Sequence, residues 1–257
     1  MFKNNTDYLD QHFLIDNRII RDFVNFAAIK NNDHVVEIGP GKGNITELLL
    51  KKAKKVTVIE IDNRLIPYLK ELKNKYHNLE IINASVLDTY IPDCDKIITS
   101  LPYSIIEPFI NKMIKCNFKT LTMIMGSTYI EDVMNKSNNK LSLLTNSFFD
   151  VEKLEDIEPS CFYPQPRTRS GIIKLSPIKI DKIKNKKRFI IRQLFFYRDM
   201  KIKNALKEAI MSYKKCSQKE AKEIIDKLNI EKEILEDKME TISNTNLKTL
   251  VNYINRL

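Results

Sequence analysis

Three of the five glycines in this 257-residue chain lie within five positions, at Gly39, Gly41 and Gly43. They follow an apolar run that ends in Glu37 and Ile38, and a helix-like segment comes directly after them. A strand, a tight glycine turn and a helix in this order form the nucleotide-binding crevice of an open α/β sheet. Glycine is needed in such a turn because a Cβ atom would keep the backbone away from a bound ligand.

The details of this turn narrow the choice of nucleotide. The third glycine comes one place too early for the dinucleotide pattern G-x-G-x-x-G. Lys42 is not followed by Ser or Thr, as a phosphate-binding loop would require. Glu37, just before the turn, suits a cationic ligand better than a pyrophosphate. S-adenosylmethionine carries a sulfonium and an ammonium group, so the turn and Glu37 favour this cofactor.

Short apolar runs alternate with amphipathic stretches through the first 125 residues. The expected strands are 34–38, 55–61, 79–83, 96–99 and 121–125, and the expected helices lie around 18–28, 44–54, 63–75 and 105–116. Strands and helices at this spacing form crossover units and a mostly parallel sheet. The expected fold class is therefore α/β, with a Rossmann-like sheet. Two later strands, at 142–151 and 171–175, lack a long helix between them, so we expect antiparallel pairing at the sheet edge.

Pro177 and the basic run after it mark an expected domain boundary. Residues 1–178 form the expected S-adenosylmethionine-binding catalytic domain, and residues 179–257, whose apolar spacing is helical, a small C-terminal domain. Residues 179–215 hold 13 Lys and Arg against 3 Asp and Glu, which gives this segment a charge of +10, equal to that of the whole chain. Concentrated positive charge is the footprint of a polyanion. We expect these helices to bind RNA.

The cysteines and histidines point to no metal site. The four cysteines are scattered without a C-x-x-C pair, and the three histidines are unclustered, so neither a zinc site nor a disulfide framework is expected. No run of about 18 apolar residues is present, so no membrane span is expected. These features are typical of a cytoplasmic protein with reduced thiols, and we expect a monomer without a metal.

Two further segments lie where α/β sheets place their active sites, at the carboxyl ends of strands. Glu60 ends the second strand 17 residues after Gly43, a spacing at which an acid can hold ribose hydroxyls. The fourth strand runs into Ser100-Leu101-Pro102-Tyr103. This matches the amino-methylase pattern of a polar residue, any residue, proline and an aromatic. The Ser100 hydroxyl and the Leu101 carbonyl can accept hydrogen bonds from a base amine, Pro102 stiffens the turn, and Tyr103 can stack on the base.

Four segments, in order along the chain, resemble the rRNA adenine N6-dimethyltransferase family, which contains the small-subunit rRNA dimethylases and the macrolide-resistance methylases. They are Gln11-His12-Phe13-Leu14-Ile15-Asp16, the stretch from Glu37 to Gly43, Leu101-Pro102-Tyr103-Ser104-Ile105, and Phe162-Tyr163-Pro164-Gln165-Pro166-Arg167-Thr168-Arg169-Ser170. The basic segment Arg192-Gln193-Leu194-Phe195-Phe196-Tyr197-Arg198, followed by Lys203-Asn204-Ala205-Leu206, resembles the family's C-terminal helical domain.

The resemblance implies further roles. Gln11, His12 and Leu14 would close over the cofactor, and Gly39 and Gly41 would pass beneath its methionine part. Phe162 would flank the flipped target base opposite Tyr103. The activity implied is transfer of methyl groups from S-adenosylmethionine to the N6 atom of an adenine in rRNA or a ribosomal subunit.

The sequence departs from the family pattern at two site positions. Ser100 stands where the family usually has Asn, and Ser85 stands where an Asp usually holds the cofactor's adenine amine. A carboxylate accepts hydrogen bonds more strongly than a hydroxyl, although the nearby Asp88 could substitute. Two alternatives follow: a catalytically impaired RNA-binding or ribosome-assembly factor on the same fold, and a methyltransferase with a different amine acceptor.

Overall fold

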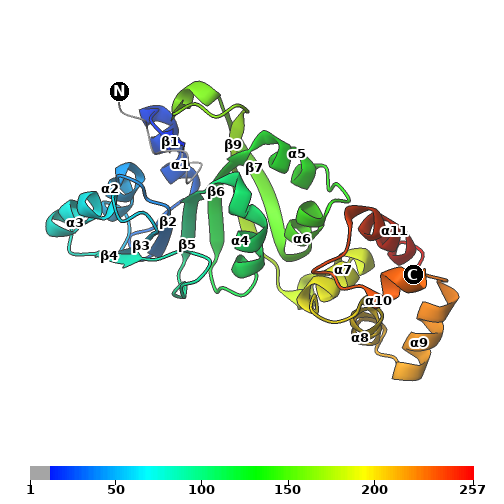
Figure 1. Ribbon diagram of the computed structural model, residues 1–257. Helices are drawn as coiled ribbons and strands as arrows, with labels where there is room; N and C mark the ends of the chain where they lie inside the picture. The colour runs from blue at the N-terminus through cyan, green and yellow to red at the C-terminus, as the bar shows by residue number, and fades with distance from the viewer. Residues whose placement is uncertain (1–11) are drawn as a thin grey trace. The chain divides into compact units, whose positions relative to one another are not determined.

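The computed structural model describes residues 12–257, and within them a seven-stranded sheet with the strand order β4-β3-β2-β5-β6-β9-β7 (Figure 1). The Rossmann-like α/β class is confirmed, because the five strands β4-β3-β2-β5-β6 pair in parallel. The strands are β2 (His34–Ile38), β3 (Lys55–Glu60), β4 (Leu79–Asn83), β5 (Lys96–Ser100), β6 (Thr120–Gly126), β7 (Phe149–Ile157) and β9 (Ser170–Pro177).

The central strands are continuous apolar runs because helices cover both faces of a parallel sheet. In β2 every residue after His34 is buried, and in β3 every residue after Lys55 is buried. The chain leaves β2 on one side toward β3 and reaches β5 on the other, so β2 and β5 flank the point where the strand order reverses. Ligands of open α/β sheets bind at the carboxyl ends of such strands.

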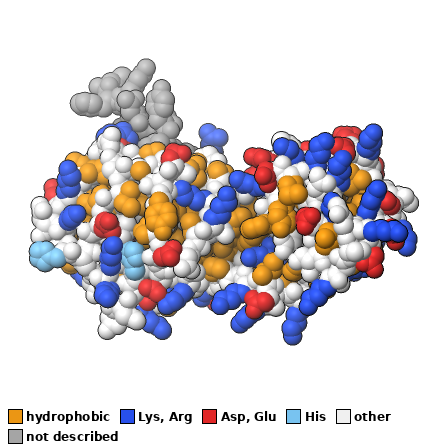
Figure 2. Space-filling model, turned by 90° about the horizontal axis from the view of Figure 1, so that it is seen from below, with side chains coloured by type: hydrophobic (Ala, Val, Ile, Leu, Met, Phe, Trp, Pro, Cys, Tyr) orange, Lys and Arg blue, Asp and Glu red, His pale blue; other side chains and the backbone are white. Residues whose placement is uncertain are grey.

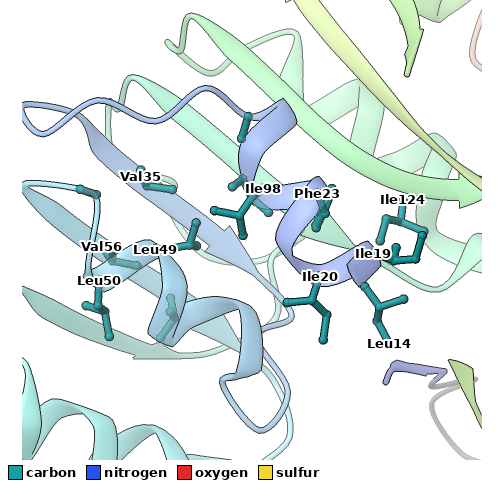
Figure 3. Packing of buried hydrophobic residues seen from close by; sticks show 14 of the residues in the cluster. Leu14, Ile19, Ile20, Phe23, Val35, Leu49, Leu50, Val56, Ile98 and Ile124 are labelled. Atoms are coloured by element: carbon teal, nitrogen blue, oxygen red, sulfur yellow. The ribbon is translucent and has the colours of Figure 1, made fainter. Parts of the chain in front are cut away.

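Helices α1 (Asn17–Phe26) and α2 (Asn44–Leu50) pack on one face of this sheet. Figure 3 shows buried side chains of this cluster, among them Phe23 of α1, Leu49 of α2 and Val35 of β2. Asp16 begins α1, because its carboxylate accepts hydrogen bonds from the backbone N–H groups of Arg18 at 2.7 Å and Ile19 at 3.1 Å. These two bonds lower the pKa of Asp16. A cap of this kind stabilises the start of the helix.

Helices α3 (Ile66–Lys75) and α4 (Ile106–Met113) lie in the crossovers that follow β3 and β5. Short 3₁₀ turns occur at η2 (Tyr103–Ile105), η3 (Pro159–Cys161) and η4 (Ile180–Lys182). The strands β1 (Phe13–Leu14) and β8 (Phe162–Tyr163) pair with each other in a separate antiparallel sheet. The segment that precedes α1 is therefore tied to a segment about 150 residues later.

The prediction of a strand over 142–151 was wrong. Residues Lys140–Phe148 form helix α6, and β7 begins only at Phe149. The Asn139 side chain caps the helix by accepting from the Ser142 N–H at 2.8 Å. The hydroxyls of Thr145 and Ser147 donate to carbonyls four residues earlier, which removes the cost of burying them in a helix.

The later strand at 171–175 was correctly placed, but its position in the sheet differs from the prediction. It forms the middle of β9, which pairs antiparallel with β6 in a register that puts Ile172 opposite Ile124. The neighbour on its other side is β7. The sheet edge is therefore β7, and β9 is an interior strand, in keeping with its burial.

The chain divides into two compact units. The first, called here the sheet unit, comprises Met1–Glu131 and Val151–Pro177; the second, called the helical unit, comprises Asp132–Asp150 and Ile178–Leu257. The sequence-based division assigned residues 132–150 to the first domain, whereas α6 groups with the helical unit. Helix α5 (Ser127–Met134) crosses from one unit into the other.

The helical unit is built from α6, α7 (Lys186–Phe196), α8 (Ile202–Lys214), α9 (Gln218–Lys227), α10 (Lys232–Glu236) and α11 (Asn244–Ile254). Its core includes Leu194 of α7 and Leu206 of α8, both fully buried. A capping box begins α9, because the Ser217 N–H donates to Glu220 Oε2 at 2.8 Å and the Glu220 N–H donates to Ser217 Oγ at 3.3 Å. Within residues 12–257, no helix has the length and apolar character needed to cross a membrane.

Candidate active site

A cavity of about 840 Å³ opens at the carboxyl ends of the parallel strands. Its walls come from the segments that follow β2, β3, β4 and β5, and from residues 12–15, 162–164 and 166 of the β1–β8 sheet and its flanks. All the residues that line it belong to the sheet unit. The volume lies within the range of small-molecule and cofactor sites.

The glycine turn forms one wall. Gly39, Gly41 and Gly43 have φ angles of +70°, +60° and +88°, a region that favours glycine. The Gly39 N–H donates to the Ile59 carbonyl at 3.0 Å, which ties the turn to β3. A Cβ atom added at Gly41 would lie 3.2 Å from Phe13 Cε1, so a side chain there would intrude where the turn approaches the β1 segment.

Gly43 has a different role from the first two glycines. It does not line the cavity, and a Cβ atom there would overlap Leu72 Cδ1 of α3. Gly43 also precedes the first residue of α2. The third glycine therefore allows α2 and α3 to pack closely, while the first two border the cavity.

Glu60 lines the cavity at the end of β3. Its Oε1 accepts from the Asp62 N–H at 2.8 Å and its Oε2 accepts from the Gly41 N–H at 3.2 Å. Burial raises the pKa of Glu60, and these backbone bonds oppose that rise. The two backbone N–H groups hold the carboxylate of Glu60 in one orientation, and each of its oxygens retains a lone pair for a ligand. The neighbouring Asp62 forms a 2.7 Å ion pair with Arg64.

The structure does not bring Glu37 to the cavity wall. Its side chain is buried, and Oε2 accepts a hydrogen bond of 2.6 Å from the Thr46 hydroxyl of α2. Burial raises the pKa of Glu37 to about 8, against the effect of the Thr46 bond, and the charge of Glu60 adds to the rise. The carboxyl group of Glu37 joins β2 to α2. Direct contact of Glu37 with a cationic ligand, which the sequence analysis predicted, therefore has no support in this geometry.

Ser85 lines the cavity in the loop that follows β4. Its hydroxyl oxygen accepts from the Leu87 N–H at 3.2 Å, which leaves the hydroxyl proton available to a ligand. The Lys112 ammonium of α4 donates to the carbonyls of Leu87 at 3.0 Å and Thr89 at 2.5 Å. Asp88, considered above as a substitute acceptor, is exposed and does not line the cavity.

Ser100, Leu101 and Pro102 line the cavity where β5 ends. The position is fixed in part by Thr99, whose buried hydroxyl donates to the Ile38 carbonyl of β2 at 3.0 Å. A Cβ atom on Gly39 would lie 3.9 Å from the Ser100 carbonyl oxygen. The expected cofactor turn and the expected amine-binding segment are therefore neighbours. The Tyr103 backbone begins η2, but its side chain lies outside what the structure describes.

Phe162 and the N-terminal segment meet at the same cavity. Leu14 of β1 is paired with Phe162 of β8, the Ile15 N–H donates to the Cys161 carbonyl at 2.9 Å, and His12 Nδ1 lies 2.7 Å from the Pro164 carbonyl oxygen. His12, Leu14 and Phe162 all line the cavity. Gln11, the other residue predicted in this segment, lies outside the described residues.

Sequence reasoning missed the apolar part of the wall. Ile61 lines the cavity with 54% of its surface exposed, and Val86 and Leu87 line it beyond β4. An isoleucine between the two acids Glu60 and Asp62, just after a buried strand, was the available signal for Ile61. No such signal marks Val86.

Among residues 12–257, no group of three or more His, Cys, Asp or Glu could hold a metal ion.

These residues fit S-adenosylmethionine. The Gly39–Gly41 turn leaves room for a ligand to come close to the backbone, and Cβ atoms would take up that room. Glu60 provides a hydrogen-bond acceptor that is held in one orientation, and Ile61 and Val86 provide apolar surface for an adenine ring. Ser85 and Ser100, at two separate strand ends, supply polar atoms at the same wall.

Comparison with known proteins agrees with this geometry. The sequence model of the ribosomal RNA adenine dimethylase family matches residues 1–246. The ribosomal RNA small subunit methyltransferase A of Clostridium acetobutylicum is 34% identical over 215 residues, covering 77% of this chain and 78% of that protein. The probable enzyme of the same name from Methanococcoides burtonii is 35% identical over 204 residues, covering 77% and 76%.

Solved structures show the same fold. A dimethyladenosine transferase from Plasmodium falciparum has a TM-score of 0.66 and 25% identity, covering 95% of this chain and 98% of that one. The 23S rRNA methyltransferase ErmE has a TM-score of 0.62 and 21% identity, covering 95% and 99%, and supports the fold alone. The family match also fixes the class of reaction, which is methyl transfer from S-adenosylmethionine. This chain belongs to the ribosomal RNA adenine dimethylase family.

Proposed function

We propose that this protein dimethylates the N6 atom of adenine in small-subunit rRNA. The observation that supports this most directly is the meeting of two sets of residues in one cavity. Gly39, Gly41 and Glu60, which would form its cofactor side, line the same cavity as Ser100 and Phe162, which would form its acceptor side. The relatives named as small-subunit methyltransferases support the choice of RNA.

On the cofactor side, each residue has a role that its geometry permits. Glu60 would accept hydrogen bonds from ribose hydroxyls, because both of its oxygens are oriented by backbone N–H groups. Ser85 would contact the adenine edge, and Ile61 its face. His12 and Leu14 would cover the cofactor from the β1 segment. When bound, S-adenosylmethionine supplies an electrophilic methyl group.

On the acceptor side, the amine of the base is a poor nucleophile because its lone pair is delocalised into the ring. The Ser100 hydroxyl and the Leu101 carbonyl would accept its two N–H groups, and Pro102 would stiffen this turn. Such acceptors favour a tetrahedral nitrogen and stabilise the positive charge that develops on it. Phe162, buried in the wall, would stack on the flipped base.

The helical unit would hold the RNA. Part of the charge of 179–215 is already paired, since Lys201 and Lys203 both bond Glu236 and lower its pKa to about 2. Lysines elsewhere in the segment are exposed: Lys179, Lys182, Lys184, Lys214 and Lys215. These are the side chains that we expect to contact phosphates. We expect the protein to act in the cytoplasm. The face drawn in Figure 2 shows Lys and Arg side chains interspersed with Asp and Glu.

Methyl transfer to purified small ribosomal subunits tests the proposal. Unmethylated subunits are incubated with the protein and isotope-labelled S-adenosylmethionine, and the rRNA nucleosides are separated by mass spectrometry. N6,N6-dimethyladenosine is the expected product. Label in another nucleoside would indicate a different acceptor, and no label from a protein that binds the cofactor would indicate the impaired binding factor.

The Ser100→Asn and Ser100→Ala variants refine this test. If Ser100 accepts the amine proton, Ser100→Ala lowers the rate and Ser100→Asn retains or increases it, because the amide oxygen is also an acceptor. Equal rates for all three proteins would remove Ser100 from the acceptor site while leaving the product assignment intact.

A further inference from the structure

An exposed aromatic pair lies at the end of α7 in the helical unit. Phe196, the last residue of the helix, has 66% of its surface exposed, and Tyr197 follows it. The ring centroids are 5.1 Å apart and the planes are 84° apart, an edge-to-face arrangement. This geometry restricts the rings while leaving at least one face of Phe196 uncovered by Tyr197.

The core of the helical unit does not account for Phe196. Helix α7 buries Phe189, Ile190, Ile191, Leu194 and Phe195, together with the polar Gln193. Phe196 is the only apolar residue of this helix that is exposed. A polar residue would satisfy the helix equally well at this position, whereas a phenylalanine leaves a large apolar ring in water.

The charge around the pair indicates what would cover it. The 179–215 segment that contains Phe196 carries 13 Lys and Arg against 3 Asp and Glu, and Arg198 follows the pair directly. A polyanion is drawn to such a segment, whereas an apolar protein surface gains nothing from it. Among polyanions, a single strand of nucleic acid also offers unstacked bases, each of which has a flat face that can stack on an aromatic ring.

We propose that Phe196, held edge-to-face by Tyr197, is a stacking platform for an unpaired base of the RNA substrate. This inference rests on the proposed RNA binding by the helical unit. The platform would lie outside the cavity of the sheet unit, so the stacked base is not the base that is methylated. Its contribution is to favour RNA with an unpaired nucleotide over a continuous duplex.

The test compares two RNA probes with full-length variants. One probe is a short fluorescent single strand that lacks adenine, so that the adenine site does not compete, and the other is a blunt duplex of equal length. The variants are Phe196→Ala, Phe196→Leu and Phe196→Trp, and the matched control is Ile180→Ala. Ile180 is 42% exposed in the same basic segment but is not aromatic. Dissociation constants are measured by anisotropy at several salt concentrations.

We expect Phe196→Ala and Phe196→Leu to weaken single-strand binding by roughly 5- to 150-fold, the range for one stacked base. Phe196→Trp and Ile180→Ala keep wild-type affinity, duplex binding is unchanged, and the salt dependence stays the same because no phosphate contact is lost. We expect every variant to remain folded, because the substituted positions are exposed, and thermal melting checks this.

Three outcomes would overturn the inference. Wild-type affinity in Phe196→Ala, with normal salt dependence, would reject the platform and leave RNA binding by the helical unit in place. Full affinity in Phe196→Leu with loss in Phe196→Ala would indicate an apolar contact of the kind a protein makes. No binding of either probe by the wild-type protein, with no effect of Lys214→Ala and Lys215→Ala on subunit methylation, would reject the proposed RNA-binding role itself.

Discussion

The Thr46 hydroxyl donates a 2.6 Å hydrogen bond to the carboxyl group of Glu37, and both side chains are buried. Glu37 belongs to β2 and Thr46 to α2, so the bond connects the two elements that the glycine turn joins. Burial raises the pKa of Glu37 to about 8, and the carboxyl group is therefore neutral at pH 7. A neutral acid at this position serves the packing of strand against helix.

Glu37→Gln tests this protonation state. Unfolding lowers the pKa of Glu37 from about 8 to its ordinary value of 4.5, so between these pH values the folded state binds more protons than the unfolded state. Stability of the wild type therefore falls as pH rises through this window and levels off above it. The glutamine variant lacks this loss. We expect it to gain a few kcal/mol on the wild type between pH 5 and 8, as measured by urea unfolding.

Glu71→Gln is the control for that experiment, because Glu71 is exposed on α3. Its stability should follow the wild-type curve at every pH. If Glu37→Gln also ran parallel to the wild type, the carboxyl group of Glu37 would be ionised in the folded protein and the assignment would fail.

Gly41→Asp should abolish cofactor binding. The substitution places a side chain at φ +60°, with its Cβ 3.2 Å from Phe13 Cε1, at a cost of about 1–3 kcal/mol for the backbone alone. It also adds a carboxylate beside Glu60, which accepts from the N–H of this residue. Calorimetric titration with S-adenosylmethionine measures the effect, with the exposed Lys54→Ala as control. Unchanged binding by a folded Gly41→Asp protein would refute the cofactor assignment.

Glu60→Gln should weaken cofactor binding by about 10- to 150-fold, the equivalent of a hydrogen bond to a charged group. The pKa of Glu60 is raised by burial, so acidification through that raised value protonates the carboxylate in the wild type and lowers its affinity. The glutamine variant should show no such decline. Glu80→Gln, on the neighbouring strand and outside the cavity, is the control. Equal pH profiles for Glu60→Gln and the wild type would exclude this role.

The sequence was sufficient to predict elements whose cause is local. Strand β2 and the glycine turn both follow from adjacent residues. The prediction of a strand over 142–151 was wrong because the apolar content of this segment is typical of a strand, although the segment forms a helix. Side-chain bonds from Asn139 and Ser147 to the backbone decide that segment, and apolar periodicity does not report them.

The strand pairing that joins two distant segments of the site could not be predicted. The pairing of Leu14 with Phe162 joins residues almost 150 positions apart, and nothing in either segment alone specifies the partner. The different environments of Glu37 and Glu60 also depend on distant contacts. Both are acids at strand ends, yet Thr46 binds one inside the fold while the other lines the cavity.

Lys112 illustrates the same limit and leads to a prediction. Its ammonium group donates to the carbonyls of Leu87 and Thr89, and so ties the loop that carries Ser85 to α4, the helix that follows the Ser100 segment. Lys112→Met removes both bonds and should let the loop move. The KM for S-adenosylmethionine should rise by about 5- to 30-fold, as expected for one or two lost hydrogen bonds, with little change in kcat at saturation.

Lys112→Arg distinguishes positioning from simple packing, because a guanidinium also donates to carbonyls and should restore most of the lost affinity. Lys115→Met, at an exposed position just after α4, controls for loss of a charge and should behave as the wild type. Steady-state kinetics with varied cofactor concentration separate KM from kcat. Equal KM values for Lys112→Met and Lys115→Met would show that the loop holds Ser85 without Lys112. A defect in kcat alone would move the role of Lys112 to the acceptor side, through α4 and the Ser100 segment that precedes it.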